Sequence, residues 1–135
     1  MEHRLFTVEE ANETIPFLEE AFARIDRQKE STRALQTQIA ILKVMWGERI
    51  RDPHSPDHEE FLARTREHQA SVEGMKELVR EIQERGCMPK DLENGLVDFY
   101  SRRQGRVVFL CWRRGEKKIS FWHELHTGYG GRVPL

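Results

Sequence analysis

The sequence predicts an α+β protein in which a long antiparallel helical hairpin precedes a small three-stranded antiparallel sheet. Three observations favour this fold class. Apolar residues recur every seven residues in two long segments before residue 86, Pro and Gly interrupt the pattern between them, and the spacing changes to two after Gly95. We expect one domain over 1–135, with a helical part at 7–86 and a β-meander with a Gly-rich tail at 95–135.

A short helix is expected to begin after Thr7. Thr7 and Glu10 have the spacing of a capping box, in which each side chain accepts a hydrogen bond from the backbone amide of the other residue. Pro16 interrupts this helix, because proline lacks the amide hydrogen and clashes within a helix interior. We therefore predict a break near residues 14–15 and a new helix from Pro16 to Trp46. One continuous, kinked helix is the alternative.

The segment 16–46 and a second helix carry matching apolar stripes. The second helix is expected to begin at Ser55 and Pro56 and to end at Gly86 with a left-handed cap. The stripe of the first helix has nine residues, and all of them except Thr32 and Gln28 are apolar. The nine are Leu18, Ile25, Thr32, Ile39, Trp46, Ala21, Gln28, Leu35 and Leu42. The second stripe consists of Phe61, His68, Met75, Ile82, Thr65, Val72 and Val79. A short connection makes the helices antiparallel, so that the stripes face each other.

Three runs with a period of two follow Gly95. They are Leu96–Ser101, Arg106–Arg113 and Lys118–Leu125, and the connections between them are as short as those of hairpins. This pattern predicts an antiparallel meander. The tail after the last run contains too many glycines to form regular structure.

Composition favours a cytoplasmic protein that self-associates. No apolar run approaches the roughly 18 residues of a membrane span, and the first residues lack the apolar stretch of a signal peptide, so we expect no membrane contact. Cys87 and Cys111 have neither metal-site spacing nor the density of a disulfide scaffold, so we expect reduced thiols. Because 33% of the residues are charged and only 38% hydrophobic, a thin core leaves the stripes to be covered in a homodimer.

The segment FWHELH at 121–126 concentrates reactive side chains. On a strand, Glu124 and His126 share a face with Trp122, whereas His123 lies on the opposite face. A zinc site needs at least three protein ligands, and a third such as Asp98 would have to come from elsewhere. We therefore expect no metal and no cofactor, and we keep a metal site at His123, Glu124 and His126 as an alternative. Acid–base catalysis by His123 and Glu124 is a further alternative.

Basic residues gather in the last 40 residues. Residues 96–135 carry eight Lys or Arg and three Asp or Glu, whereas residues 1–95 carry 14 Lys or Arg and 20 Asp or Glu. Cationic loops near aromatic rings are typical of single-strand nucleic-acid binding. The residues concerned are Arg102, Arg103, Arg106, Arg113, Arg114, Lys117 and Lys118. We do not favour this alternative, because a sequence pI near 6.6 falls short of a strongly basic domain.

Four segments carry a resemblance to a known family: LFTVEEANETIPFL, GLVDF, VFLCW and FWHELHTGYGGRVPL. Through them nearly the whole chain resembles a family of small bacterial proteins known only as a domain of unknown function. The residues that match the family pattern are Asp98, Trp112, Trp122, His123, Glu124, Gly128, Gly131, Arg132 and Pro134. His126 stands where the family has an acidic residue. The resemblance implies an architecture and a patch of residues, and no activity.

The sequence does not indicate a biochemical activity. We expect a non-catalytic interaction or regulatory module that self-associates through its helical hairpin and has a protein partner still to be identified. A metal-assisted or acid–base enzyme centred on FWHELH is the alternative, and nucleic-acid binding is the third. The candidate functional patch is Asp98, Trp122, His123, Glu124 and Arg132. Within it we expect Arg132 to fold back onto Glu124 and to order the Gly-rich tail.

Overall fold

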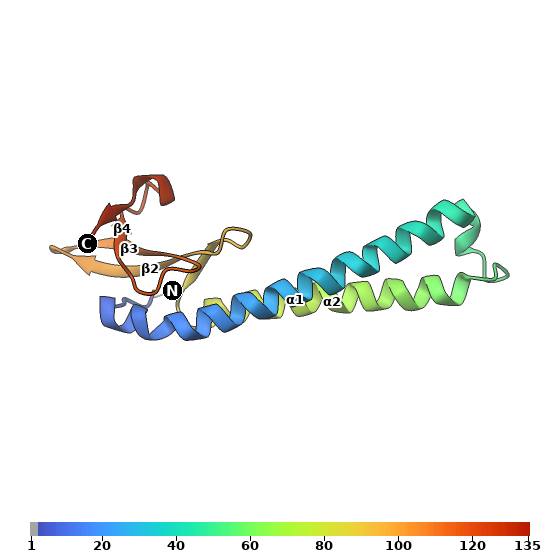
Figure 1. The fold of residues 1–135 in the computed structure, drawn as a ribbon, viewed down its shortest axis with the longest axis horizontal. Coiled ribbons are helices and arrows are strands. Elements are labelled where there is room, and N and C mark those ends of the chain that lie inside the picture. The colour runs from blue at the N-terminus through green and yellow to red at the C-terminus, as the bar shows by residue number, and fades with distance from the viewer. Residues whose placement is uncertain (1–2) are drawn as a thin grey trace. The chain divides into compact units, whose positions relative to one another are not determined.

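The computed structural model describes residues 3–135 and confirms the α+β class (Figure 1). The chain forms two compact units. The sheet unit combines the chain up to Ala23 with residues 79–135, and the hairpin unit is formed by residues 24–78. The helices are α1 (Val8–Trp46), η1 (Gly47–Arg51, a 3-10 helix), α2 (His58–Glu84) and η2 (Tyr129–Gly131, also 3-10). The strands are β1 (Met88–Asp91), β2 (Leu96–Arg103), β3 (Arg106–Arg113), β4 (Phe121–His123) and β5 (Val133–Pro134). The expectation of a single domain stays a prediction.

Helix α1 begins as predicted and then continues through Pro16 without a break. The Thr7 amide donates to Glu10 Oε1 at 2.9 Å, and the Glu10 amide donates to Thr7 Oγ1 at 3.1 Å, which confirms the capping box. The predicted break near residues 14–15 is wrong. Proline costs about 3 kcal/mol inside a helix, but Ile15 and Leu18 on either side of it are buried, and their packing outweighs that cost.

In the hairpin unit the antiparallel helices are joined by polar contacts as well as by an apolar cluster. Gln28 Nε2 donates to the Ser71 carbonyl at 2.8 Å, and the hydroxyls of Thr32 and Ser71 lie 2.6 Å apart. The apolar cluster lies near the connection and consists of Leu42, Ile50 and Phe61, with Ile39, Trp46 and Leu62 against it. A polar centre of this kind differs from a continuous coiled-coil seam. Helix α2 begins at His58, slightly later than predicted.

The sheet has five antiparallel strands in the order β1-β2-β3-β4-β5, so the prediction of three strands is wrong. The two missed strands are the edges, and each contains a proline, which is tolerated at an edge but weakens a strand pattern. The third predicted run is a strand only over Phe121–His123. The tail, expected to be irregular, forms η2 and β5.

The core of the sheet unit lies between the sheet and the first turns of α1, which run along one face of the sheet in Figure 1. Trp112 on β3 is the largest fully buried side chain, and its ring centre lies 6.1 Å from that of Phe22 on α1. Asn12 Oδ1 accepts a hydrogen bond from the Ile119 amide at 2.6 Å and ties the helix to the connection before β4. Since side chains alternate along a strand, Cys111 beside Trp112 faces the other side of the sheet.

None of the helices formed by residues 3–135 combines the length and the apolar character that a membrane crossing requires.

Candidate functional site

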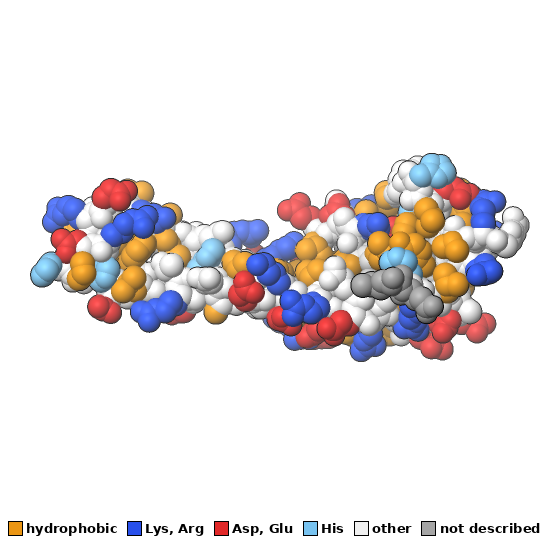
Figure 2. Space-filling view, turned by 180° about the vertical axis from the view of Figure 1, so that it is seen from behind, with side chains coloured by type: hydrophobic (Ala, Val, Ile, Leu, Met, Phe, Trp, Pro, Cys, Tyr) orange, Lys and Arg blue, Asp and Glu red, His pale blue; other side chains and the backbone are white. Residues whose placement is uncertain are grey.

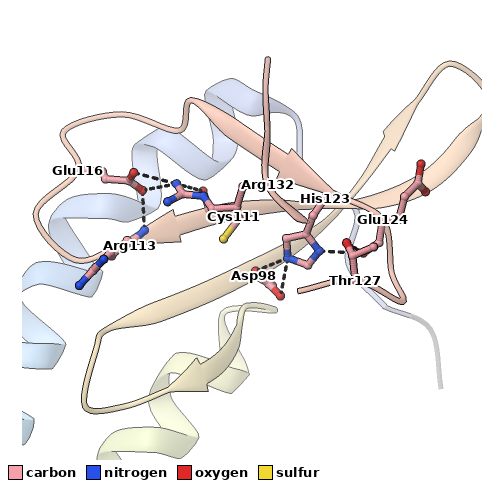
Figure 3. Close-up of polar contacts among 8 residues, drawn as sticks. All are labelled: Asp98, Cys111, Arg113, Glu116, His123, Glu124, Thr127 and Arg132. Atoms are coloured by element: carbon pink, nitrogen blue, oxygen red, sulfur yellow. Dashed lines mark hydrogen bonds and ion pairs between the residues drawn. The ribbon is translucent and has the colours of Figure 1, made fainter. Parts of the chain in front are cut away.

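The strand register brings Asp98, Cys111 and His123 together on the face of the sheet opposite the α1 core. Asp98 on β2 is directly paired with Cys111 on β3, and β3 pairs with β4 so that His123 lies opposite Phe109, two residues from Cys111. One ligand atom from each of the three side chains lies within 4.8 Å of the other two. All three residues are buried, with exposed fractions of 4% for Asp98, 1% for Cys111 and 2% for His123. Figure 3 shows the Cys111 sulfur turned toward Asp98.

Both ring nitrogens of His123 face acceptor oxygens. Nδ1 lies 2.7 Å from the backbone carbonyl of Glu124 and donates to it in the tautomer that carries a proton on Nδ1. Nε2 lies 3.1 Å from each of the two carboxylate oxygens of Asp98 (Figure 3). In that tautomer a neutral ring would aim its Nε2 lone pair at the Asp98 carboxylate. The contact is therefore favourable when Nε2 carries a second proton or binds a cation.

The two buried cysteines are protonated at neutral pH. Burial raises the pKa of the Cys111 thiol to about 12, and the nearby charge of Asp98 and a hydrogen bond to it act in the same direction. Burial also raises the pKa of Cys87 to about 11. Neither thiol is an activated nucleophile, because the thiolate is the reactive form. A bound metal cation reverses this preference at Cys111, since a coordinating thiol loses its proton.

A cavity of about 150 Å³ adjoins the three residues. Its lining is mainly apolar, with one lysine. The lining residues are Lys90, Leu96, Asp98, Phe109, Cys111, His123, Leu125, Thr127, Gly128 and Tyr129. A group held by Asp98, Cys111 and His123 would therefore be accessible from a space large enough for a small molecule.

Glu124 and His126, the other residues of the metal set considered from the sequence, do not join His123. The Glu124 carboxylate forms an ion pair with Arg106, and Figure 3 shows it turned away from the His123 ring. His126 is exposed in the turn after β4. Trp122 lies on the same side as Glu124, with the Arg106 guanidinium 5.7 Å from its ring centre. The neighbours of His123 are Asp98 and Cys111 instead.

Arg132 pairs with Glu116, so the predicted contact with Glu124 is wrong. Its Nη2 lies 2.7 Å from both carboxylate oxygens of Glu116. Its guanidinium lies 4.0 Å from the ring centre of Phe121 and 4.6 Å from that of Tyr129. Because β5 runs antiparallel to β4, the Arg132 side chain reaches back over Phe121 toward the β3–β4 connection. The pair links the tail to the β3–β4 connection, and whether it orders the tail stays a prediction.

The basic residues considered for nucleic-acid binding divide between the two ends of β3. Arg102, Arg103 and Arg106 lie at the β2–β3 turn, and Arg113, Arg114, Lys117 and Lys118 lie at the other end. Eight residues of strand separate the two ends by roughly 23 Å. On the face drawn in Figure 2, acidic and basic side chains are interspersed. This arrangement does not favour a continuous nucleic-acid surface.

The comparisons with known proteins identify one family. A sequence model of the family described as "Uncharacterized conserved protein (DUF2203)" matches residues 4–135. No curated protein and no solved structure matches the chain.

Proposed function

The chain belongs to the DUF2203 family of uncharacterised conserved proteins, and from the geometry of its own residues we propose that it binds one zinc ion at Asp98, Cys111 and His123. The observation that carries this proposal is the orientation of His123. Its Nδ1 hydrogen is held by a backbone carbonyl, while Nε2 is directed at both oxygens of the Asp98 carboxylate. Histidines that bind metals almost always donate their other ring hydrogen to a carbonyl or carboxylate in this way.

The three side chains supply the sulfur, nitrogen and oxygen ligands that suit zinc. Zinc bonds of 2.0–2.3 Å in a tetrahedron correspond to distances of about 3.3–3.7 Å between ligand atoms. The distance of 3.1 Å between His123 Nε2 and the Asp98 oxygens is close to this range, and Cys111 Sγ lies within 4.8 Å of both groups. Small side-chain rotations suffice to share one ion. A thiolate with an imidazole favours zinc over magnesium or calcium, which prefer oxygen ligands.

Three protein ligands leave one position of a tetrahedral ion open. Structural zinc sites use four protein ligands, whereas catalytic sites use three and keep a water molecule or a substrate on the fourth. Here the fourth position would face the cavity of about 150 Å³. Zinc in such a position lowers the pKa of bound water to about 7 and polarises carbonyl groups. The arrangement therefore supports the metal-assisted enzyme considered from the sequence, with a different ligand set.

The test is a zinc titration of metal-free protein against a chromophoric chelator, with the metal content confirmed by mass spectrometry. We expect one zinc ion per chain. Cys111→Ala should lower the zinc affinity on the order of 100-fold or more, because it removes a ligand. Cobalt(II) in place of zinc should give a thiolate-to-metal charge-transfer band that Cys111→Ala abolishes.

The matched control is Cys87→Ala, which removes the other buried cysteine of the sheet unit. It should leave both the zinc affinity and the cobalt band unchanged. A wild-type protein that takes up no zinc would contradict the proposal. So would an equal loss of affinity in both variants.

We propose as a second function that the hairpin unit self-associates through the exposed face of α1. Ile41, Val44 and Met45 are exposed there, and Val44 has an exposed fraction of 86%. Together with Thr37 and Ala40 they line a shallow surface pocket, with the spacing of three and four residues that places side chains on one helix face. A second copy related by a two-fold axis would bury this face against itself. An interaction or regulatory role would use the same surface.

Sedimentation equilibrium at micromolar concentration tests the second proposal. We expect a species of twice the 16.0 kDa chain mass for the wild type, and a monomer for Val44→Lys, because the charge would be buried in the dimer. Gln69→Lys, at an exposed position of α2, is the control and should remain dimeric. A monomeric wild type contradicts self-association. A dimer that survives Val44→Lys contradicts this surface.

A further inference from the structure

We infer that the cavity beside Asp98, Cys111 and His123 binds a small organic carboxylate, whose carboxylate group occupies the open position of the metal ion. This inference rests on the proposed zinc site and names the class of ligand that the site takes. It follows from the size, the lining and the charge of the cavity.

The size of the cavity limits only the part of the ligand that it holds, because exposed side chains such as Leu125 and Tyr129 line it. A volume of about 150 Å³ is close to that of an apolar protein cavity known to hold benzene. The part of the ligand inside the cavity therefore has roughly six to nine non-hydrogen atoms, including those that reach the metal.

The lining favours a ligand with an apolar part. Leu96, Phe109 and Leu125 contribute hydrocarbon and ring surface to the cavity wall. The Thr127 hydroxyl, which also lies at the cavity, already donates to the Glu124 carbonyl at 3.2 Å. An apolar group in contact with these side chains gains roughly 25 cal/mol for each Å² of surface removed from water, whereas an inorganic anion gains nothing from them.

The charge of the site favours a single negative charge on the ligand. Zinc with the Asp98 carboxylate and the Cys111 thiolate has no net formal charge, and Asp98 is the one acidic residue among those that line the cavity. Lys90 adds a positive charge, and its Nζ lies 5.0 Å from the ring centre of Phe109 in the cavity wall. The nearby carboxylate of Glu124 is neutralised by Arg106. A monocarboxylate would therefore balance Lys90 while it binds the metal.

The experiment is calorimetric titration of zinc-loaded protein with benzoate, which matches the cavity in size, and with benzamide, its uncharged analogue. We expect benzoate to bind one to one and benzamide at least tenfold more weakly. Inorganic phosphate, which has no apolar part, should also bind more weakly than benzoate. Metal-free protein should bind benzoate at least tenfold more weakly than zinc-loaded protein.

Lys90→Met separates the role of the charge from that of the metal, because methionine keeps most of the apolar stem. It should weaken benzoate binding about tenfold and leave the zinc stoichiometry at one. Lys118→Met, an exposed lysine of the β3–β4 connection, is the control and should change neither. A chain that takes up no zinc contradicts the metal site. If the wild type takes up zinc but binds benzoate no better than benzamide, only the carboxylate inference is contradicted. The same holds if Lys90→Met binds benzoate as tightly as the wild type does.

Discussion

Replacing Trp112 by alanine is expected to lower the free energy of unfolding by about 3–5 kcal/mol, as truncation of a buried aromatic residue does. Trp112 has no exposed surface and packs against Phe22. Its indole Nε1 also donates to the Glu116 carbonyl at 2.8 Å, which holds the β3–β4 connection in place. The variant would lose the apolar contacts, leave a cavity, and deprive a carbonyl of its partner.

Urea denaturation followed by far-ultraviolet circular dichroism measures this effect without relying on tryptophan fluorescence. Trp122→Ala is the matched control, because it makes the same truncation at a partly exposed position of the neighbouring strand. It should cost less than half as much. An equal cost for the two variants would contradict the conclusion that the complete burial of Trp112 is the reason for its larger contribution to stability.

The parts of the fold that the sequence predicts correctly depend on local signals. The capping box of Thr7 and Glu10 satisfies backbone groups within one helical turn, and Gly86 ends α2 with a φ of +93°, which glycine adopts without strain. Strands β2 and β3 are recognised by their β-branched and aromatic residues and by the short Gly-containing turn between them, although the middle of β3 is buried on both faces. Each of these features can be recognised within a few residues of chain.

The parts that the sequence predicts wrongly depend on contacts between distant residues. Helix α1 passes through Pro16 because its buried face packs in the sheet unit, and a local rule does not include that contribution. Strand β5 has only two residues and is held by pairing with β4. Arg132 contacts Glu116 because the pairing of β5 with β4 directs the Arg132 side chain over Phe121. None of these contacts has a sequence pattern of its own.

Of the three residues of the candidate site, the sequence singles out Asp98 and His123 by residue type but not Cys111. Cys111 lies between apolar neighbours and has the pattern of an inert core residue. Its position beside Asp98 depends on the register of β2 and β3, which the turn at Gln104 and Gly105 determines. These two residues have φ angles of 52° and 80°, so the turn has two residues and pairs Arg103 with Arg106. Counting residues back from that turn along both strands pairs Asp98 with Cys111. A two-residue turn at Gln104 and Gly105 is therefore the sequence feature from which this pair could be predicted.

Replacing Asp98 by asparagine is expected to have two separate effects. In metal-free protein it weakens the buried contact with the His123 ring, and leaving a buried polar group without a good partner costs about 1–3 kcal/mol. In the presence of zinc it also removes an anionic ligand, so the zinc affinity should fall on the order of 100-fold or more. The first effect is measured by urea denaturation in a chelating buffer, and the second by zinc titration.

A natural control lies in the connection of the hairpin unit. Asp52 Oδ1 is 3.1 Å from His54 Nδ1, which is a carboxylate–imidazole contact of the same length as that of Asp98, but it is exposed to solvent. Water screens an exposed pair, so Asp52→Asn should change stability little and zinc binding not at all. The comparison isolates burial as the reason why Asp98 matters.

The two effects of Asp98→Asn distinguish a metal site from a structural ion pair. If zinc binds the native chain, a concentration of free zinc 1,000 times the dissociation constant should raise the free energy of unfolding by about 4 kcal/mol, and a 100-fold loss of affinity in Asp98→Asn should remove about 2.7 kcal/mol of this gain. A purely structural pair would also make Asp98→Asn unstable in the chelating buffer. It would not make the stability of the wild type depend on zinc. A wild-type protein whose unfolding is the same with zinc and with chelator, together with an unstable Asp98→Asn variant, would assign Asp98 and His123 to the fold alone.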